Sequence, residues 1–435
     1  MSENMINENE VLIPTAVAED IKNASTANSD VILKVENLCQ YFKLGHSTLK
    51  AVNNVNFEIK RGEVFGLVGE SGCGKTTTGR SIIKLYNCTS GNVYFDGRRI
   101  CAGTKSYKDT KSAAFKEMIT AIKNRKNAEN PVDVKAEINK YLAIAKEENA
   151  KIKAARFDHK KCDKVYAQEH VAAVKAEYVD KLKAMDKESV EYKELNKEYK
   201  KNLRLARKER IVTKIQMIFQ DPIASLDPRM TVKEIIAEGL IIKGVKDKKV
   251  IEEKVYDVLE KVGLVREHAG RYPHEFSGGQ RQRIGVARSI IMQPELIIAD
   301  EPVSALDVSI QAQVINLLNE LRHELGITIL FVAHDLSVVK YFSDRIAVMY
   351  FGNMVELASS EELFKNPMHP YTKSLLSAIP LPDPVYEKTR TRIVYNPLAD
   401  HDYSVQGPTF REVAPGHFVS CNDDEFKKYQ EMLNK

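Results

Sequence analysis

A short glycine-rich segment between an apolar strand and a helix constrains the fold of this chain most strongly. Residues 64–68 read Val-Phe-Gly-Leu-Val and predict a buried strand, and residues 81–85 predict a helix. Between them, residues 69–76 read Gly-Glu-Ser-Gly-Cys-Gly-Lys-Thr, which fits the pattern G-x-x-x-x-G-K-[ST]. A strand, such a loop and a helix, in that order, predict an α/β fold of the phosphate-loop class.

The residue types of this loop indicate what it binds. Its glycines let backbone N–H groups turn inward around a phosphate, and the start of the helix adds a favourable partial charge. Lys75 is placed to reach the β- and γ-phosphates of a nucleotide, and the Thr76 hydroxyl is placed to ligate Mg²⁺. Cys73 is expected to contribute only its backbone. A chance match to the pattern is the alternative, and the flanking strand and helix argue against it.

The composition is typical of a globular core with additions. The chain has 435 residues, 43% hydrophobic and 29% charged, with a formal net charge of +5. This mild basic excess is weak evidence for an acidic partner or an anionic membrane surface. None of the six cysteines forms a Cys-x-x-Cys pair, so we expect free thiols in a reducing cytosol.

We expect no exported or membrane-spanning segment. The polar N-terminus lacks the basic start and long apolar run of a signal peptide. No run approaches the roughly 20 apolar residues that a spanning helix needs. Any membrane association is therefore predicted to be peripheral.

Composition divides the chain into five predicted segments. They are a mobile leader (1–30), the first part of the core with the glycine-rich loop (31–102), an inserted helical projection (103–210), the remainder of the core (211–355) and a C-terminal extension (356–435). Within the core, strands are predicted at 31–35 and 53–59 with a turn around Gly45, in a hairpin at 91–97, and at 215–219, 296–299 and 327–333. Helices between the later strands are what a parallel sheet requires.

The segment 103–210 is dominated by Lys, Glu and Ala, and its apolar residues recur at helical spacing in narrow stripes. We predict two or three helices packed against each other as an antiparallel projection. Polar residues near 127–131 and near 157–159 are the expected bends. A solvated helical spacer is the simpler interpretation, and an arm that docks on a partner is the alternative.

A second motif supplies paired acids. Residues 296–299 read Leu-Ile-Ile-Ala, a buried strand, and Asp300 and Glu301 follow at its carboxyl end. Asp300 is placed to hold Mg²⁺ through water, because Mg²⁺ sheds its water reluctantly. Glu301 is the candidate base or orienting group for an attacking water. Two exposed acids at the start of a loop are the alternative.

A third motif extends the pattern beyond a generic phosphate loop. Residues 276–281 read Phe-Ser-Gly-Gly-Gln-Arg, and alone they would be an ordinary helix-capping turn. After the glycine-rich loop and before Asp300 and Glu301, they resemble the signature of the ABC ATPase family. The resemblance implies a phosphate-loop NTPase core with a parallel sheet, an antiparallel β subdomain and an α-helical signature subdomain, here carrying an inserted helical hairpin or coiled coil. It also implies a head-to-tail dimer, in which the signature of one subunit closes over the ATP of the other.

The same resemblance assigns further positions. Gln220 resembles the family glutamine that contacts Mg²⁺ and water, residues 304–307 resemble the loop that communicates across the dimer, and His334 resembles the switch histidine at the γ-phosphate. An aromatic ring stacks on adenine in this family, and Phe42 or its neighbour Tyr41 stands at that position. The residues expected at ATP are Phe42, Gly69, Glu70, Ser71, Gly72, Cys73, Gly74, Lys75, Thr76, Thr77, Ser277, Gly278, Gly279, Gln280 and Asp307. The residues expected at the metal are Thr76, Gln220 and Asp300, and those expected in catalysis are Glu301, His334, Gln220 and Lys75.

Residues toward the C-terminus resemble one subgroup of this family. Residues 366–376, with His-Pro-Tyr at 369–371, and residues 220–230 resemble the ATPases of oligopeptide, dipeptide and nickel importers. The similarity spans roughly residues 31–102 and 211–385, and family members usually pass from the hairpin to Gln220 with far fewer residues than 103–210. No residue here contacts a solute that we can name, so the peptide substrate comes from the family alone.

The resemblance implies an ATP-hydrolysing subunit that powers peptide import at the cytoplasmic face of the membrane. Its implied partners are a second ABC ATPase subunit (a related chain or another copy), two transmembrane permease subunits and an extracytoplasmic peptide-binding protein; no nucleic acid is expected. An importer of nickel or another solute is an alternative. A non-transport ATPase of the SMC or DNA-repair type is the runner-up suggested by the inserted helices. Against it, the insertion is short and precedes Gln220, and the His-Pro-Tyr element is typical of importers.

Overall fold

The computed structural model describes residues 30–124, 133–379 and 392–433. The chain separates into two compact units. The first unit comprises Met1–Val35 and Asn87–Ile211, and the second unit comprises Glu36–Tyr86 and Val212–Lys435. The predicted leader and the predicted bend near 127–131 lie outside the described residues, apart from Asp30.

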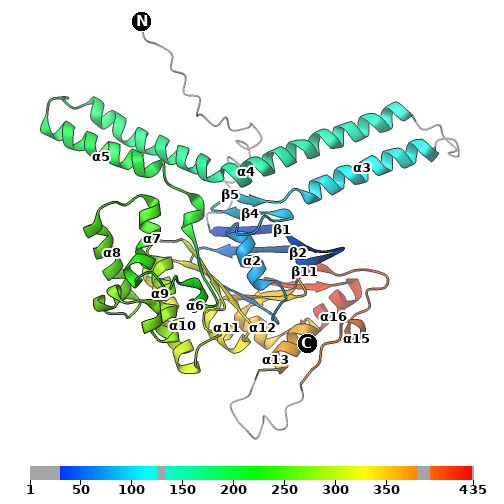
Figure 1. The fold of residues 1–435 in the computed structure, drawn as a ribbon. Helices are drawn as coiled ribbons and strands as arrows, with labels where there is room; N and C mark the ends of the chain where they lie inside the picture. The colour runs from blue at the N-terminus through cyan, green and yellow to red at the C-terminus, as the bar shows by residue number, and fades with distance from the viewer. Residues whose placement is uncertain (1–29, 125–132, 380–391, 434–435) are drawn as a thin grey trace. The chain divides into compact units, whose positions relative to one another are not determined.

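A mostly parallel sheet forms the centre of the second unit (Figure 1). Its strands, in spatial order, are β11 (Thr409–Ala414), β12 (His417–Cys421), β10 (Asn353–Ser359), β9 (Arg345–Tyr350), β3 (Val64–Val68), β8 (Thr328–Ala333), β7 (Leu296–Asp300) and β6 (Ile215–Ile218). The neighbours from β9 to β6 pair in parallel, whereas β10, β12 and β11 extend the sheet with antiparallel pairs. Every residue of β3, β7 and β8 is buried, as continuous apolar runs in a parallel sheet predict.

Helices pack around this sheet. They are α2 (Lys75–Ile82), α6 (Pro222–Ser225), α7 (Val232–Lys243), α8 (Lys248–Lys261), α9 (Gly278–Ile290), α10 (Val308–Leu325), α11 (Leu336–Phe342), α12 (Ser360–Lys365), α13 (Pro370–Ser377), α15 (Pro397–Asp400) and α16 (Asp423–Leu433), with the short 3-10 helices η1 (Ile211–Lys214), η2 (Arg266–Gly270) and η3 (Pro273–Glu275). Capping boxes, with Thr231 before α7 and Ser277 before α9, fix where these two helices begin. The buried faces of α7, α8, α9 and α10 join the sheet in one hydrophobic core.

The N-terminal strands are longer than the sequence predicts. Strand β1 (Val31–Leu44) and strand β2 (Ser47–Lys60) flank the expected turn at Gly45, whose φ of 60° suits glycine. Side chains extend the pairing, because Tyr41 Oη donates to Asn53 Oδ1 at 2.6 Å. The strands continue through polar residues such as Asn53 because only one face of them is buried.

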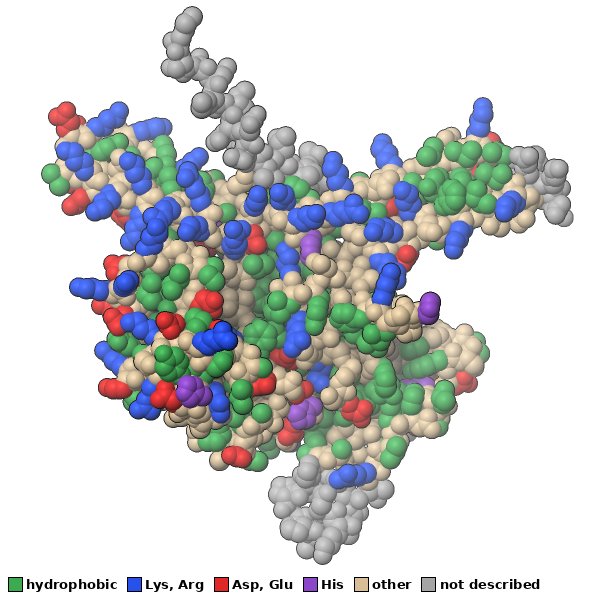
Figure 2. All heavy atoms as spheres, in the orientation of Figure 1, with side chains coloured by type: hydrophobic (Ala, Val, Ile, Leu, Met, Phe, Trp, Pro, Cys, Tyr) green, Lys and Arg blue, Asp and Glu red, His purple; other side chains and the backbone are tan. Residues whose placement is uncertain are grey.

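The first unit combines a hairpin with three long helices among its described residues. Strands β4 (Ser90–Phe95) and β5 (Arg98–Ala102) pair antiparallel around Asp96 and Gly97, which both have positive φ, as a tight hairpin turn requires. Helix α4 (Val134–Lys183) contacts α3 (Lys105–Asn124) along one part and α5 (Val190–Ala206) along another (Figure 1). Lys and Arg side chains gather along these helices on the face that Figure 2 shows.

The predicted bend at residues 157–159 is wrong, because α4 runs through it without a break. Asp158 is a buried residue that anchors the helix, since its carboxylate accepts a hydrogen bond from Arg99 Nε of β5 at 2.7 Å. No glycine or proline interrupts the helix there. The break follows residue 183 instead, and Ser189 caps α5 by accepting from the N–H of Tyr192.

We expect Asp158→Ala to destabilise the first unit by about 3 kcal/mol, because it leaves a buried guanidinium without its carboxylate. Only 12% of the Arg99 side chain and 11% of the Asp158 side chain are exposed. Glu169→Ala is the matched control, since Glu169 pairs with the neighbouring Arg98, both side chains are more exposed (34% and 32%), and the change is expected to cost less than about 1 kcal/mol. Urea unfolding followed by helical circular dichroism measures both, and equal losses would contradict this account.

A buried carboxylate organises the C-terminal region of the second unit. Glu356 of β10 is fully buried and accepts hydrogen bonds from the backbone N–H groups of Met368 and His369, at 2.7 and 3.0 Å. His417 Nε2 of β12 lies 2.8 Å from the same carboxylate. His369 in turn caps α13, because its Nδ1 accepts from the N–H of Tyr371 at 3.1 Å. The His-Pro-Tyr sequence is thus a helix start: a capping histidine, a proline at the first helical position and a tyrosine in the first turn.

Burial, with smaller electrostatic contributions from the neighbouring His401 and Lys373, lowers the pKa of His369 to about 3. In the unfolded chain a histidine titrates near 6.5, so below that pH the unfolded state binds a proton that the folded state excludes. The contribution of His369 to the free energy of unfolding therefore falls as the pH falls, by up to about 1.4 kcal/mol for each pH unit below 6.5.

We expect His369→Asn, which keeps a capping side chain, to lose less stability than the wild type between pH 7 and pH 5. Urea unfolding at the two pH values measures the difference. His46→Asn changes an exposed histidine and is expected to follow the wild type. If His369→Asn and the wild type lose the same free energy over this interval, the buried neutral histidine is not the cause.

All six cysteines are free, as predicted. Within the described residues, no helix is both long enough and apolar enough to cross a membrane.

Candidate active site

The glycine-rich loop connects β3 to α2, and its backbone requires glycine. Gly69, Gly72 and Gly74 all have positive φ, at 150°, 84° and 109°. A Cβ on Gly74 would lie 2.1 Å from the carbonyl oxygen of Ala51, and one on Gly69 would lie 2.2 Å from that of Met349. The loop therefore turns tightly against two neighbouring strands and presents the N–H groups at the start of α2.

Lys75, the first residue of α2, is buried and points back into this loop. Its Nζ donates hydrogen bonds to the carbonyl oxygens of Gly69 and Glu70, at 2.7 and 3.0 Å. Glu301 Oε1 lies 3.9 Å from the same nitrogen. The buried ammonium group is thus compensated by carbonyl dipoles on one side and a carboxylate on the other.

Thr76 and Asp300 form a second polar pair. Thr76 Oγ1 donates to Asp300 Oδ1 at 2.7 Å, and Asp300 is fully buried at the carboxyl end of β7. Burial raises the pKa of Asp300 above its ordinary value. Asp300 Oδ2 is buried and has no hydrogen-bond partner in the described part of the chain. A buried carboxylate oxygen without a partner, beside a hydroxyl, is a set of donors that fits a hard divalent cation.

Glu301 is held at the centre of a third group. Gln220 Nε2 donates to Glu301 Oε2 at 2.8 Å, and His334 Nδ1 lies 3.1 Å from the same oxygen. Glu301 has a φ of 45°, which a non-glycine residue rarely adopts, and its N–H donates to Val332 O of β8 at 2.9 Å. Such strain persists only where the surroundings fix the backbone, and it is typical of functional sites.

The structure therefore brings together Lys75, Thr76, Gln220, Asp300, Glu301 and His334. The reason is topological, because the residues follow the carboxyl ends of parallel strands, and those ends share one edge of the sheet. The sequence gives no reason to expect the contact of Glu301 with the β8 backbone.

The signature residues lie at the start of a different helix. Ser277 is exposed and caps α9, where its Oγ accepts from the N–H of Gln280 at 3.3 Å and Gln280 Oε1 accepts from its N–H at 3.1 Å. A Cβ on Gly279 would lie 2.5 Å from Ile310 Cγ2, so α9 packs closely against α10 at this point. Among the described residues, no hydrogen bond or ion pair joins Ser277 or Gln280 to the residues that gather around Lys75 and Glu301.

The aromatic and loop candidates occupy separate positions. Phe42 packs edge-to-face on Tyr86, with ring centroids 5.4 Å apart, whereas the hydroxyl of Tyr41 is engaged with Asn53. Asp307 precedes α10 without a capping hydrogen bond from its side chain, and Ser304 Oγ donates to the carbonyl oxygen of Glu301 at 3.1 Å. The choice between Phe42 and Tyr41 as the adenine contact stays a prediction.

The fold and the site together define a nucleotide-binding protein of the phosphate-loop class. A family model described as ABC transporter matches residues 52–171 and 180–304, and a model described as the C-terminal region of oligopeptide/dipeptide transporters matches residues 355–412.

Three relatives narrow the assignment. The oligopeptide transport ATP-binding protein OppF of Bacillus subtilis is 46% identical, over 92% of this chain and 99% of the relative. The corresponding protein AmiF of Streptococcus pneumoniae is 40% identical, over 93% and 100%. The dipeptide transport ATP-binding protein DppF of Lactococcus lactis is 39% identical, over 92% and 96%. A solved nucleotide-free ATP-binding cassette from an ABC transporter aligns with a TM-score of 0.46 at 20% identity, over 77% of this chain and 94% of that chain.

The chain therefore belongs to the ABC transporter family, among its oligopeptide and dipeptide transport ATP-binding proteins. It is an ATP-binding, ATP-hydrolysing subunit, as the motifs predict.

We expect Gly74→Ala to destabilise the second unit more than Gly72→Ala does. Both positions have positive φ, which costs alanine about 1–2 kcal/mol. Only Gly74 adds an overlap with a backbone oxygen, because nothing lies within 4 Å of a Cβ on Gly72. Thermal unfolding of the two variants compares them directly, and equal shifts would show that Gly74 is not confined by β2.

Proposed function

We propose that the chain is the ATP-hydrolysing subunit of an importer that takes up oligopeptides or dipeptides through separate permease subunits. One observation carries the proposal: a buried lysine and two acids converge on a glycine loop, with an unpartnered carboxylate oxygen beside a hydroxyl. The family of the chain and its relatives, which are oligopeptide and dipeptide transport ATP-binding proteins, supply the transported solute.

In this proposal the phosphate loop and Lys75 bind the β- and γ-phosphates of ATP. Backbone N–H groups from Gly69, Ser71, Gly72, Cys73, Gly74, Lys75, Thr76 and Thr77 form the cradle, with Glu70 as part of the loop. Thr76, Asp300 and Gln220 would hold Mg²⁺, which would supply positive charge beside the phosphates. Asp300 Oδ2 supports this assignment, since a buried carboxylate oxygen is costly without a partner.

Glu301 orients the attacking water and accepts its proton. Its Oε2 is fixed by Gln220 and His334, so the carboxylate cannot rotate freely. Proton transfer by a positioned carboxylate contributes about 10²–10⁴-fold to a rate. His334, whose side chain is half exposed and lies next to Glu301, is placed to contact the γ-phosphate.

The exposed start of α9 binds the nucleotide of a second subunit. Its cap Ser277 with Gly278, Gly279 and Gln280 presents N–H groups and a hydroxyl, which suit an anion at a helix start. Asp307 lies at the neighbouring helix start, and Phe42 stacks on adenine. The second subunit is a related chain or another copy.

The remaining partners follow from the importer assignment. Two permease subunits bind this chain at the cytoplasmic face of the membrane, and an extracytoplasmic protein delivers peptide to them. Co-purification with the native permease, followed by ATPase assays with peptides and with nickel, tests the solute. Stimulation by DNA and not by permease would instead support the SMC-type alternative.

We expect Glu301→Gln to reduce ATP hydrolysis about 10²–10⁴-fold in the assembled transporter, while ATP binding is retained. The amide keeps the shape of the side chain but cannot accept the proton. Glu295→Gln makes the same change beside the opposite end of β7, where Glu295 pairs with Lys214 and Arg61, and is expected to leave turnover unchanged. Wild-type turnover in Glu301→Gln would remove the proposed role of Glu301.

A further inference from the structure

A tyrosine from the C-terminal region reaches the phosphate loop, although the two are 301 residues apart in the chain. The backbone N–H of Glu70 donates a hydrogen bond to the hydroxyl oxygen of Tyr371 at 3.0 Å. The glycine-loop pattern requires no such contact, and the start of α13, which the His-Pro-Tyr sequence at 369–371 forms, does not require it either.

The hydrogen bond involves the peptide group that also holds the loop lysine. The carbonyl oxygen of Gly69 accepts from Lys75 Nζ at 2.7 Å, and the N–H of the same peptide group, on Glu70, donates to Tyr371. One planar peptide group therefore links the ammonium of Lys75 to the tyrosine hydroxyl. Such a group cannot rotate without breaking one of the two bonds, and hydrogen bonds in series strengthen each other.

The constraint is needed because glycine precedes this peptide group. Gly69 has a φ of 150°, a conformation open to glycine but rare for other residues. Glycine also offers its peptide many alternative orientations. A fixed acceptor on the N–H side selects the orientation that directs the carbonyl oxygen at Lys75.

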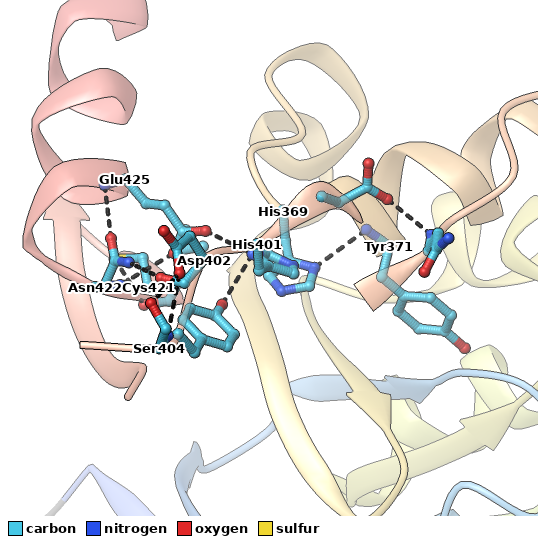
Figure 3. Close-up of polar contacts among 12 residues, drawn as sticks. His369, Tyr371, His401, Asp402, Ser404, Cys421, Asn422 and Glu425 are labelled. Atoms are coloured by element: carbon cyan, nitrogen blue, oxygen red, sulfur yellow. Dashed lines mark hydrogen bonds and ion pairs between the residues drawn. The ribbon is translucent and has the colours of Figure 1, made fainter. Parts of the chain in front are cut away.

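Tyr371 is itself held rigidly. It is only 1% exposed, and the rings of Tyr350 and Tyr395 lie with their centroids 4.5 and 5.5 Å from its own. Its backbone lies in the first turn of α13, where His369 accepts its N–H, and Figure 3 shows its ring directed away from His401. Burial raises the pKa of Tyr371, so its hydroxyl stays protonated and neutral.

We propose that Tyr371 is a positioning residue for Lys75, acting through the peptide group between Gly69 and Glu70. An ammonium group has three N–H donors, and carbonyl oxygens of Gly69 and Glu70 take two of them. The other contacts of the ammonium group are longer, since Cys73 Sγ and Glu301 Oε1 both lie 3.9 Å from Nζ, so the third N–H is the one that can turn to the terminal phosphates of ATP. The C-terminal region thus tunes the affinity for ATP, an inference that rests on the proposed role of Lys75.

Tyr371→Phe in the full-length chain tests this, because it removes one oxygen atom and keeps the ring. We expect MgATP to bind about tenfold more weakly, which corresponds to about 1.4 kcal/mol. We also expect faster hydrogen exchange at the Glu70 amide. Tyr395→Phe is the matched control: its ring belongs to the same cluster, and its hydroxyl makes no hydrogen bond among the described residues. It is expected to match the wild type in both measurements.

Each result has a definite meaning. If wild-type protein does not bind MgATP, the proposed function fails. If wild type binds and Tyr371→Phe has wild-type affinity and exchange, only the role of Tyr371 is overturned. An equal loss of affinity in both variants would assign the effect to aromatic packing and would also overturn it.

Discussion

The burial of the Lys75 ammonium group is the constraint on which the rest of the site depends. A buried charge is tolerated only with opposite charge or strong acceptors around it. Here two loop carbonyls and the carboxylate of Glu301 provide them. The parallel sheet places the glycine loop, the end of β7 and the ends of two other strands at one edge, where Gln220 and His334 hold Glu301 close to Lys75. The groups that compensate the Lys75 ammonium group therefore also belong to the phosphate-binding loop and to its surroundings.

The C-terminal region stabilises the glycine loop through a hydrogen bond from the Glu70 N–H to Tyr371. Buried Glu356 accepts hydrogen bonds from the backbone of the turn before α13. Helix α13 in turn places the hydroxyl of Tyr371 next to the glycine loop. Unpaired backbone groups are costly when buried, so both the turn and the loop gain from these acceptors. A region that shares no motif with the nucleotide site is in this way connected to it by hydrogen bonds.

The first unit is organised by a different buried pair. Arg99 in the hairpin and Asp158 in the middle of α4 neutralise each other, and α3 and α5 pack on the two parts of the helix. The narrow apolar stripes in the sequence suit this kind of packing of helix on helix. Its anchor to the hairpin therefore lies near the middle of α4.

The sequence by itself determined the class of fold and the family, and it predicted the residues that the structure brings together around Glu301 and Asp300. It could do so because each motif is a local pattern in which a strand, a turn and a helix leave few choices of backbone. It failed at residues 157–159, where polar side chains suggested a bend, because the partner of Asp158 is a strand residue 59 positions away. It also gave no sign that Tyr371 touches Glu70. Only the tertiary structure decided such contacts, because pairing between distant segments depends on where the whole sheet places them.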